Sequence, residues 1–277
     1  MIRERVADNV YVFTSELYAQ VNAGAVVGPD FSVVIDTLAY PEETLEIRDF
    51  IENKLGSRVR YVINTHYHAD HALGNGWFKG AVVLGHRLAR QLMDGLGRES
   101  LERARQRSRE LRDVELVLPD VVFDGGELNL RVGKRTLQLM SLPGHSPDGL
   151  GVLVLEDRVL FSGDAMMPLP HLVSGDLEAM TASLKRIPRL KLENVIQGHG
   201  EVILRGEILN AVRSNLYYIA CVRREVTRAS RRRDPLGYLA SVTIESCGKS
   251  RILLGGLADD LHRRNLAGVY RSLYGEA

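Results

Sequence analysis

The chain of 277 residues carries 36 lysines and arginines against 35 acidic residues, which gives a formal net charge of +1. This balance excludes a global electrostatic field built to capture nucleic acid, an anionic membrane or acidic substrates. With 45% hydrophobic residues, the composition is that of a globular protein that can bury a sizeable core. Any preference for a charged partner must therefore arise locally.

The cysteines and the first residues bear on the compartment. Cys221 and Cys247 are too few, and too far from the histidines, to suggest a disulfide scaffold or a thiolate metal site, and they fit a reducing compartment. The start of the chain, MIRERVADNVYVF, lacks the apolar segment of a signal peptide, and no run of about 18 apolar residues follows. These features predict a cytoplasmic protein.

Strand-like runs dominate the first third of the chain. The runs NVYVFTS, GAVVG, FSVVID, RYVIN and AVVLG are rich in β-branched and aromatic residues and are bounded by turn residues, so each predicts a strand. Between the third and fourth of them, residues 41–56 predict an amphipathic helix with Ile47, Phe50, Ile51 and Leu55 on one face.

The remaining elements follow the same logic. Residues 86–113 predict a solvated helix, interrupted near Gly95–Gly97, whose arginines are interleaved with acids. Residues 121–162 predict several strands, and the segment from Asp176 to Ile187 predicts a helix with an aspartate cap. Residues 206–277 predict a mainly helical C-terminal segment.

No fixed-period repeat, low-complexity linker or convincing domain boundary occurs, so residues 1–277 are predicted to form a single domain. Blocks of strands are separated by helices and do not alternate with them regularly. This arrangement favours a two-sheet α/β or α+β sandwich with outer helices over a doubly wound sheet.

Three histidines and one aspartate lie within six residues of the segment THYHADHALGN, directly after the strand-like run VRYVIN. They are His66, His68, Asp70 and His71. A neutral imidazole is a common zinc ligand, and a carboxylate adds the charge that holds a second cation. Residues two apart in an extended segment point the same way. His66 and His68 can therefore converge on one ion while Asp70 and His71 face a neighbouring position.

Further metal-binding residue types follow other predicted strands. His145 occurs in LPGHSPD, Asp164 in FSGDAMM and His199 in QGHG, each beside a glycine that permits a tight bend and a close approach to an ion. Each residue alone would be an ordinary loop residue. Their recurrence at strand ends, together with the dense histidine cluster, predicts that all seven residues form one metal centre.

Three other histidines lack this support. His86 is predicted to begin a helix, and His262 is predicted to be exposed among the charges of a helix. His171 lies in the proline-rich stretch PLPHLV shortly after Asp164, where it could line the pocket and contact substrate.

The motifs THYHADH, PGHS, SGD and GHG, in this order, resemble the metallo-β-lactamase-fold superfamily over about residues 8–203. The resemblance implies an α+β fold, an αββα sandwich of two face-to-face sheets flanked by helices. It also implies two divalent metal ions, usually zinc and sometimes iron or manganese. By motif position, the residues that it implies for the first ion are His66, His68 and His145, those for the second are Asp70, His71 and His199, and Asp164 would bridge both. Asp70 would also shuttle a proton during turnover.

Hydrolysis is the expected chemistry, because two adjacent divalent ions lower the pKa of a shared water and stabilise developing negative charge. A bridging acid resembles the branch with glyoxalase-II-like thioesterases, lactonases and phosphodiesterases. We expect a small-molecule substrate with an ester, thioester, lactone or related bond, and no membrane partner. Two departures, Asp148 in GHSPDGLG and the turn HALGN in place of His-x-Gly-Gly, leave the subfamily open.

Several alternatives share parts of this pattern. A tRNA-processing or other phosphodiesterase could use the arginines between Arg223 and Arg233 on phosphates, although a solvated helix end is favoured for that stretch. An iron-dependent persulfide dioxygenase and a β-lactamase use the same fold. A binding protein that has lost the chemistry would have lost some of the seven residues, and all are present.

Overall fold

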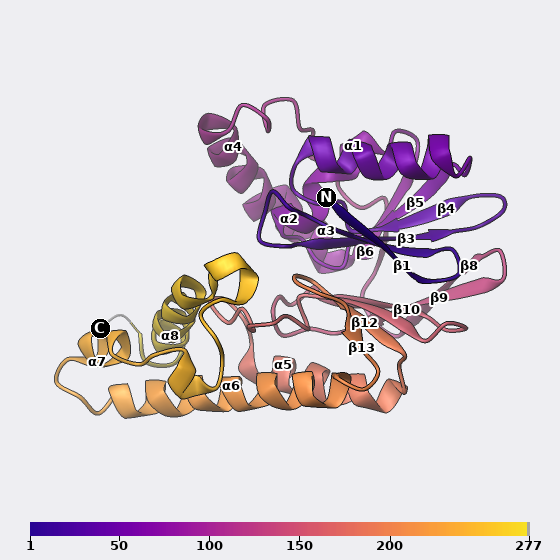
Figure 1. Ribbon diagram of the computed structural model, residues 1–277. Coiled ribbons are helices and arrows are strands. Elements are labelled where there is room, and N and C mark those ends of the chain that lie inside the picture. The colour runs from indigo at the N-terminus through magenta and orange to yellow at the C-terminus, as the bar shows by residue number, and fades with distance from the viewer. Residues whose placement is uncertain (276–277) are drawn as a thin grey trace.

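The computed structural model describes residues 1–275, in which two β-sheets pack face to face with helices on both outer faces (Figure 1). The first sheet contains seven strands in sequence order. They are β1 (Ile2–Ala7), β2 (Val10–Thr14), β3 (Asn22–Val27), β4 (Ser32–Ile35), β5 (Val59–Ile63), β6 (Val82–His86) and β7 (Val121–Phe123).

The second sheet has the spatial order β13-β12-β11-β10-β9-β8. Its strands are β8 (Glu127–Val132), β9 (Arg135–Ser141), β10 (Leu150–Val154), β11 (Val159–Gly163), β12 (Asn194–Gln197) and β13 (Ile203–Leu204). The α-helices are α1 (Pro41–Asp49), α2 (Ala69–Ala72), α3 (Arg87–Leu92), α4 (Arg98–Arg107), α5 (Leu177–Arg186), α6 (Ile208–Ala229), α7 (Pro235–Ala240) and α8 (Ala258–Tyr274). This is the predicted α+β sandwich.

The alternation of side chains along each strand explains the layers. In β4, Val33 and Ile35 enter the core between the sheets, whereas Val34 packs on the outer face under α1. In β10, Val152 joins the same central core and Leu153 faces the layer formed by α5, α6 and α8. Because successive residues of a strand point to opposite faces, a strand buried on both sides reads as a continuous apolar run.

The strand directions bring particular strand ends to one edge. Strands β4, β5 and β6 are mutually parallel, so the residues that follow β4 and β5 lie side by side. In the second sheet β11 is parallel to β12, and both β9 and β11 are antiparallel to β10. The segments that follow β9, β11 and β12 therefore emerge at a common edge. An isolated bridge between Val21 and His199 links the two sheets there.

The helix boundaries differ locally from those predicted. The helix expected for residues 41–56 is α-helical only as far as Asp49. The chain then continues as a wider helical turn over Phe50–Lys54, and Leu55 is exposed. The helix expected for 86–113 ends at Arg107, and the break near Gly95–Gly97 is a wider turn, η3 (Met93–Gly97). None of the helices in residues 1–275 combines the length and the apolar composition that a bilayer span requires.

The C-terminal segment packs against the second sheet chiefly through the long helix α6, with α8 beside α6 (Figure 1). Asn265 of α8 joins this segment to the loop after β11, because its side chain accepts a hydrogen bond from Leu172 N at 2.7 Å and donates one to Pro170 O at 2.7 Å. Lys249 donates to Pro168 O in the same loop. The helical segment therefore determines the course of residues 168–172.

Two expectations about this segment were wrong. Cys221 of α6 and Cys247 of the short turn η5 (Glu245–Cys247) form a disulfide, because the fold brings their Cα atoms within 5.4 Å although 26 residues separate them. His262 is fully buried, not exposed: its Nδ1 lies 3.0 Å from Tyr218 Oη and its Nε2 3.1 Å from Val242 O. Its charged sequence neighbours lie on the other face of α8, toward solvent.

Candidate metal centre

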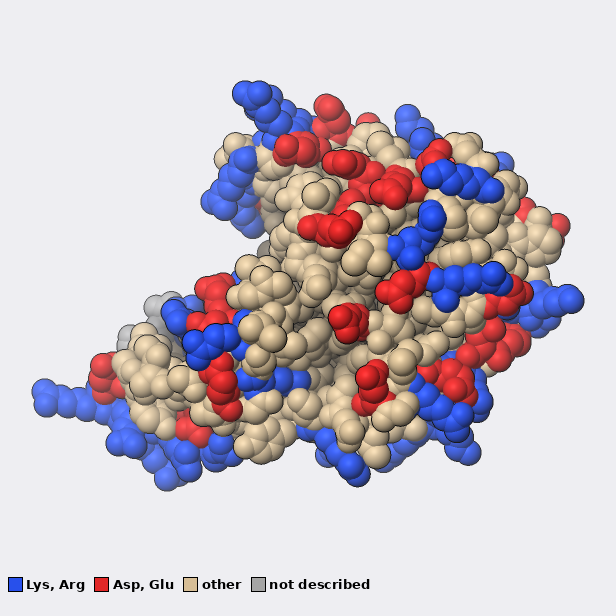
Figure 2. Space-filling view, viewed as in Figure 1, with Lys and Arg blue, Asp and Glu red and all other residues tan. Residues whose placement is uncertain are grey.

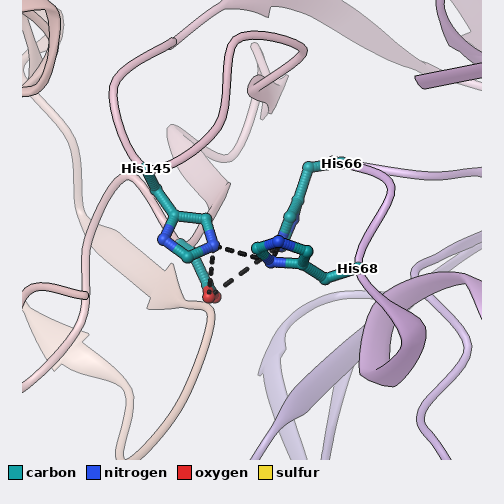
Figure 3. Close-up of side chains that lie close together, drawn as sticks. His66, His68 and His145 are labelled. Atoms are coloured by element: carbon teal, nitrogen blue, oxygen red, sulfur yellow. Dashed lines mark hydrogen bonds and ion pairs between the residues drawn. The ribbon is translucent and has the colours of Figure 1, made fainter. Parts of the chain in front are cut away.

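Three histidines from two strand ends converge on one carboxylate oxygen (Figure 3). His66 and His68 extend from the segment after β5, and His145 extends from the loop after β9. His68 Nδ1 lies 3.1 Å from His66 Nε2 and 2.8 Å from His145 Nε2. Oδ2 of Asp164, which follows β11, lies 3.2 Å from His145 Nε2 and 3.8 Å from His66 Nε2. These four donor atoms form a group of the size that holds one cation.

A second group faces the other oxygen of the same carboxylate. Asp164 Oδ1 lies 3.3 Å from His71 Nε2 and 3.6 Å from His199 Nε2. Asp70 Oδ2 lies 3.3 Å from His199 Nε2 and 3.9 Å from His71 Nε2. The structure therefore brings all seven predicted residues together in two adjacent groups, with one carboxylate oxygen of Asp164 directed at each.

Several ring nitrogens are oriented by hydrogen bonds on the side away from the cluster. His71 Nδ1 donates to Asp36 Oδ2 at 2.8 Å, and His199 Nδ1 donates to Ala19 O at 2.9 Å. His145 Nδ1 faces the carbonyl oxygen of His171 at 3.3 Å. A proton held at Nδ1 leaves the lone pair at Nε2, which is the arrangement that metal-binding histidines adopt in proteins.

Asp36 is a further residue of this site that was not predicted from the sequence. It is buried, and besides His71 it accepts hydrogen bonds from Thr65 N at 2.7 Å and from Thr65 Oγ1 at 2.7 Å. Asp36 directly follows β4, the parallel neighbour of β5. The signal that pointed to Asp164, an acid at the end of a buried strand, was therefore present in the run FSVVID as well.

The charge state of the rings suits metal binding. Burial lowers the pKa of His66, His68 and His145, that of His145 to about 3, so the first group offers neutral imidazoles. Burial also opposes the charged form of His71, but the three carboxylates around it, Asp164 foremost, outweigh burial and raise its pKa well above the ordinary value. The second group therefore stabilises positive charge.

Unpaired atoms provide an independent test of whether metal ions fit. Among the described residues, His71 Nε2 and Asp164 Oδ1 are buried without a hydrogen-bond partner. A buried polar atom that lacks a partner costs roughly 1–3 kcal/mol, and a cation between these atoms would remove that cost. Nitrogen and carboxylate ligands of this kind suit zinc, and imidazole also suits iron. The residues present fit a pair of divalent ions.

Glycines permit this close approach at two positions. A Cβ added to Gly198, which precedes His199, would lie 1.8 Å from Asp164 Oδ1. Gly163, which precedes Asp164, has φ +49°, and an added Cβ would lie 2.6 Å from Thr65 Oγ1. Any larger residue would displace the Asp164 carboxylate or the strand end that carries the first histidines.

A cavity of about 330 Å³ opens onto the donor atoms. Its walls include Tyr18 from the loop between β2 and β3, Ser100 of α4, and four residues of the C-terminal segment, Leu254, Leu257, Leu261 and Arg264. His171 also lines this cavity, as the sequence suggested that it could, and a contact between His171 and substrate stays a prediction. In Figure 2 the surface is indented between the part that carries α4 and the C-terminal helices.

His86 and the arginines near the end of α6 lie away from the donor cluster. His86 caps α3, where its Nδ1 accepts a hydrogen bond from Leu88 N, as expected for a helix start. The arginines near the end of α6 are largely exposed and paired with acids, Arg228 with Glu225 and Arg223 with Glu178. These contacts are those of a solvated helix end.

Asp148, one of the two sequence departures, is buried in the loop after His145. Neither of its carboxylate oxygens has a hydrogen-bond partner among the described residues, and burial raises its pKa to about 6. Since the folded pKa exceeds the unfolded value, this group favours folding only while it is protonated. Its contribution to the free energy of unfolding should be complete below about pH 4 and should be lost as the pH rises through about 6.

We expect Asp148→Asn to stabilise the protein at pH 8 by up to about 2 kcal/mol, because the amide removes a buried charge. Thermal unfolding should show a higher Tm for this variant at pH 8 and a smaller difference at pH 5. Exposed Asp30, replaced by asparagine, serves as the control. An equal difference at both pH values would contradict a raised pKa.

The fold and the seven-residue cluster define a metal-binding protein of the two-sheet sandwich class. The family model described as metallo-beta-lactamase superfamily matches residues 18–202. The chain therefore belongs to the metallo-beta-lactamase superfamily.

Individual relatives are more distant. The chain is 29% identical over 150 residues to the beta-lactamase-like protein 2 homolog of Caenorhabditis elegans, covering 53% of this chain and 44% of that protein. It is 28% identical over 146 residues to hydroxyacylglutathione hydrolase of Methylococcus capsulatus, covering 51% and 48%. The chain thus spans about half the length of these curated relatives.

Among solved structures, the sec-alkylsulfatase Pisa1 from Pseudomonas sp. superposes with a TM-score of 0.77 at 16% identity. The superposition covers 99% of this chain and 50% of that one. At this identity the likeness shows the fold alone, but it includes the C-terminal helical segment.

Proposed function

We propose that this chain is a dinuclear metallohydrolase that cleaves an ester, thioester, lactone or related bond in a small molecule. The observation that carries this proposal is the division of the Asp164 carboxylate, whose two oxygens face two separate groups of donors. The similarity to hydroxyacylglutathione hydrolase supports hydrolysis as the reaction class.

In this proposal His66, His68 and His145 would hold the first ion, Asp70, His71 and His199 would hold the second, and Asp164 would serve both. Zinc is the proposed metal, because buried neutral imidazoles with carboxylates are its common ligands. When bound, the ions supply Lewis acidity, which activates water and stabilises the charge that develops on a carbonyl oxygen.

The protein residues contribute positioning and proton transfer. Asp70 is the most exposed of the carboxylates in the cluster and lines the cavity. Burial opposes its ionisation, but His71 and His199 outweigh burial and keep the pKa of Asp70 below the ordinary value. Because this ionised carboxylate faces the cavity, we assign Asp70 the role of accepting a proton during attack and returning it to the leaving group.

Metal analysis combined with a substrate panel tests the proposal. The purified protein should contain two ions per chain and should hydrolyse at least one of a set of ester, thioester and lactone substrates, with activity lost on chelation and restored by zinc. A phosphodiester and a β-lactam complete the panel. A single iron per chain together with oxygen consumption on glutathione persulfide would overturn the proposal, as would cleavage of the phosphodiester alone.

A further inference from the structure

One wall of the cavity over the metal centre comes from the C-terminal segment. The segment from the turn η6 (Leu253–Gly256) into helix α8 supplies Leu254, Leu257, Leu261 and Arg264 to the lining of the cavity that also exposes the donor side chains. Leu254 and Leu261 are buried, and Leu257 is half exposed. Three leucines therefore give an apolar patch to a cavity whose lining also includes Arg264 and several of the donor side chains.

Arg264 is the one lysine or arginine among the residues that line this cavity. Tyr18 and His171 line the same cavity as Arg264, together with the donors His68, Asp70, Asp164 and His199. Arg264 thus shares one cavity with residues of the metal centre.

The existing partner of Arg264 does not remove its capacity to bind a ligand. Its Nε lies 3.0 Å from Asp260 Oδ2 one helical turn away, and both side chains are more than half exposed. Such exposed pairs contribute little free energy. Because a guanidinium has five N–H donors in a planar fork, the other N–H groups can bind a carboxylate or a similar anion.

We infer that Arg264 binds an anionic group of the substrate, and that the leucine wall holds a short apolar segment between this group and the bond that is cleaved. The substrate class is then an acyl ester or thioester whose acyl chain carries a distal negative charge. This inference rests on the proposed function for the site of cleavage, whereas the anion subsite can be tested separately by binding.

The first test compares two esters of equal chain length, mono-4-nitrophenyl glutarate and 4-nitrophenyl pentanoate. Wild-type protein should prefer the glutarate in kcat/KM, and Arg264→Gln should reduce this preference about tenfold, mainly through KM, because one charge-assisted contact is lost. Arg263→Gln is the matched control. Arg263 is the adjacent residue of α8, pairs with Asp259 in the same way, and does not line the cavity.

A second test does not depend on hydrolysis. Calorimetry with the amide analogues N-phenylglutaramate and N-phenylpentanamide on metal-loaded protein should show tighter binding of the anionic compound, and Arg264→Gln should abolish the difference. Equal preference in wild type and Arg264→Gln, or the same loss in Arg263→Gln, would overturn the subsite. If neither ester is cleaved but the anionic amide binds through Arg264, the subsite stands and the proposed bond class is wrong.

Discussion

Replacing Asp70 with alanine is expected to reduce hydrolysis by roughly 10³-fold, because the change removes both a metal donor and the group assigned to proton transfer, and proton transfer alone contributes 10²–10⁴-fold. The fold should persist. Asp70 lies in the cluster beside His199 and at the cavity wall, not in a hydrophobic core. Steady-state kinetics, metal analysis and thermal unfolding of the metal-free protein measure the three consequences.

Two further variants sharpen this prediction. Asp70→Asn keeps the size of the side chain, so an equal loss of activity with two ions still bound would indicate the proton-transfer role specifically. Asp124→Ala removes an exposed aspartate that pairs with Arg87, far from the cluster in sequence, and should behave like wild type. Wild-type turnover by Asp70→Ala would contradict the mechanism.

Asp36→Asn is expected to weaken binding of the second metal ion by about 10–100-fold, the usual consequence of losing a hydrogen-bond partner behind a metal ligand. An asparagine can still accept the hydrogen bond from Thr65 N, but its NH₂ group would then face Thr65 Oγ1 and His71 Nδ1. The favoured response is a change of tautomer in His71. A proton on Nε2 would occupy the lone pair proposed to bind the ion.

Competition with a chromophoric chelator would measure this loss, with the first ion expected to be retained more strongly than the second. Glu43→Gln provides a matched control, since Glu43 is also buried and accepts hydrogen bonds from Ser15 Oγ and Glu16 N outside the metal centre. Two ions bound by Asp36→Asn with wild-type affinity would show that Asp36 does not set the tautomer of His71.

The layers and the donor types could be predicted from local patterns. Strand runs are recognised because their side chains alternate between two faces, and runs such as FSVVID are apolar throughout because both faces are covered. The cluster from His66 to His71 was recognisable because its donors are close in sequence. Asp164 could be found because it follows a buried strand beside a glycine, and the same pattern at Asp36 shows that this signal was not used fully.

Other features depend on contacts between residues far apart in the chain. His262 was wrongly expected to be exposed, because its charged neighbours in α8 conceal a buried partnership with Tyr218 of α6. The pairing of Cys221 with Cys247 likewise follows from the packing of a turn against α6. Helical spacing does place His262 on the same face of α8 as Leu261 and Leu266, but only the packing of α8 against α6 reveals the polar groups that it meets.

The sequence by itself determined the two-sheet sandwich, the seven metal-binding residue types and hydrolysis as the expected chemistry, because these depend on periodicity and on short motifs at strand ends. The family resemblance already implied how the donors divide around Asp164, and only the tertiary structure revealed that Asp36 orients His71. Only the fold, too, brought Arg264 to the lining of the cavity that opens onto the donor atoms. The cavity wall is built by a segment that follows the last metal-binding motif, and the packing of α8 beside α6 alone brings that wall to the donors.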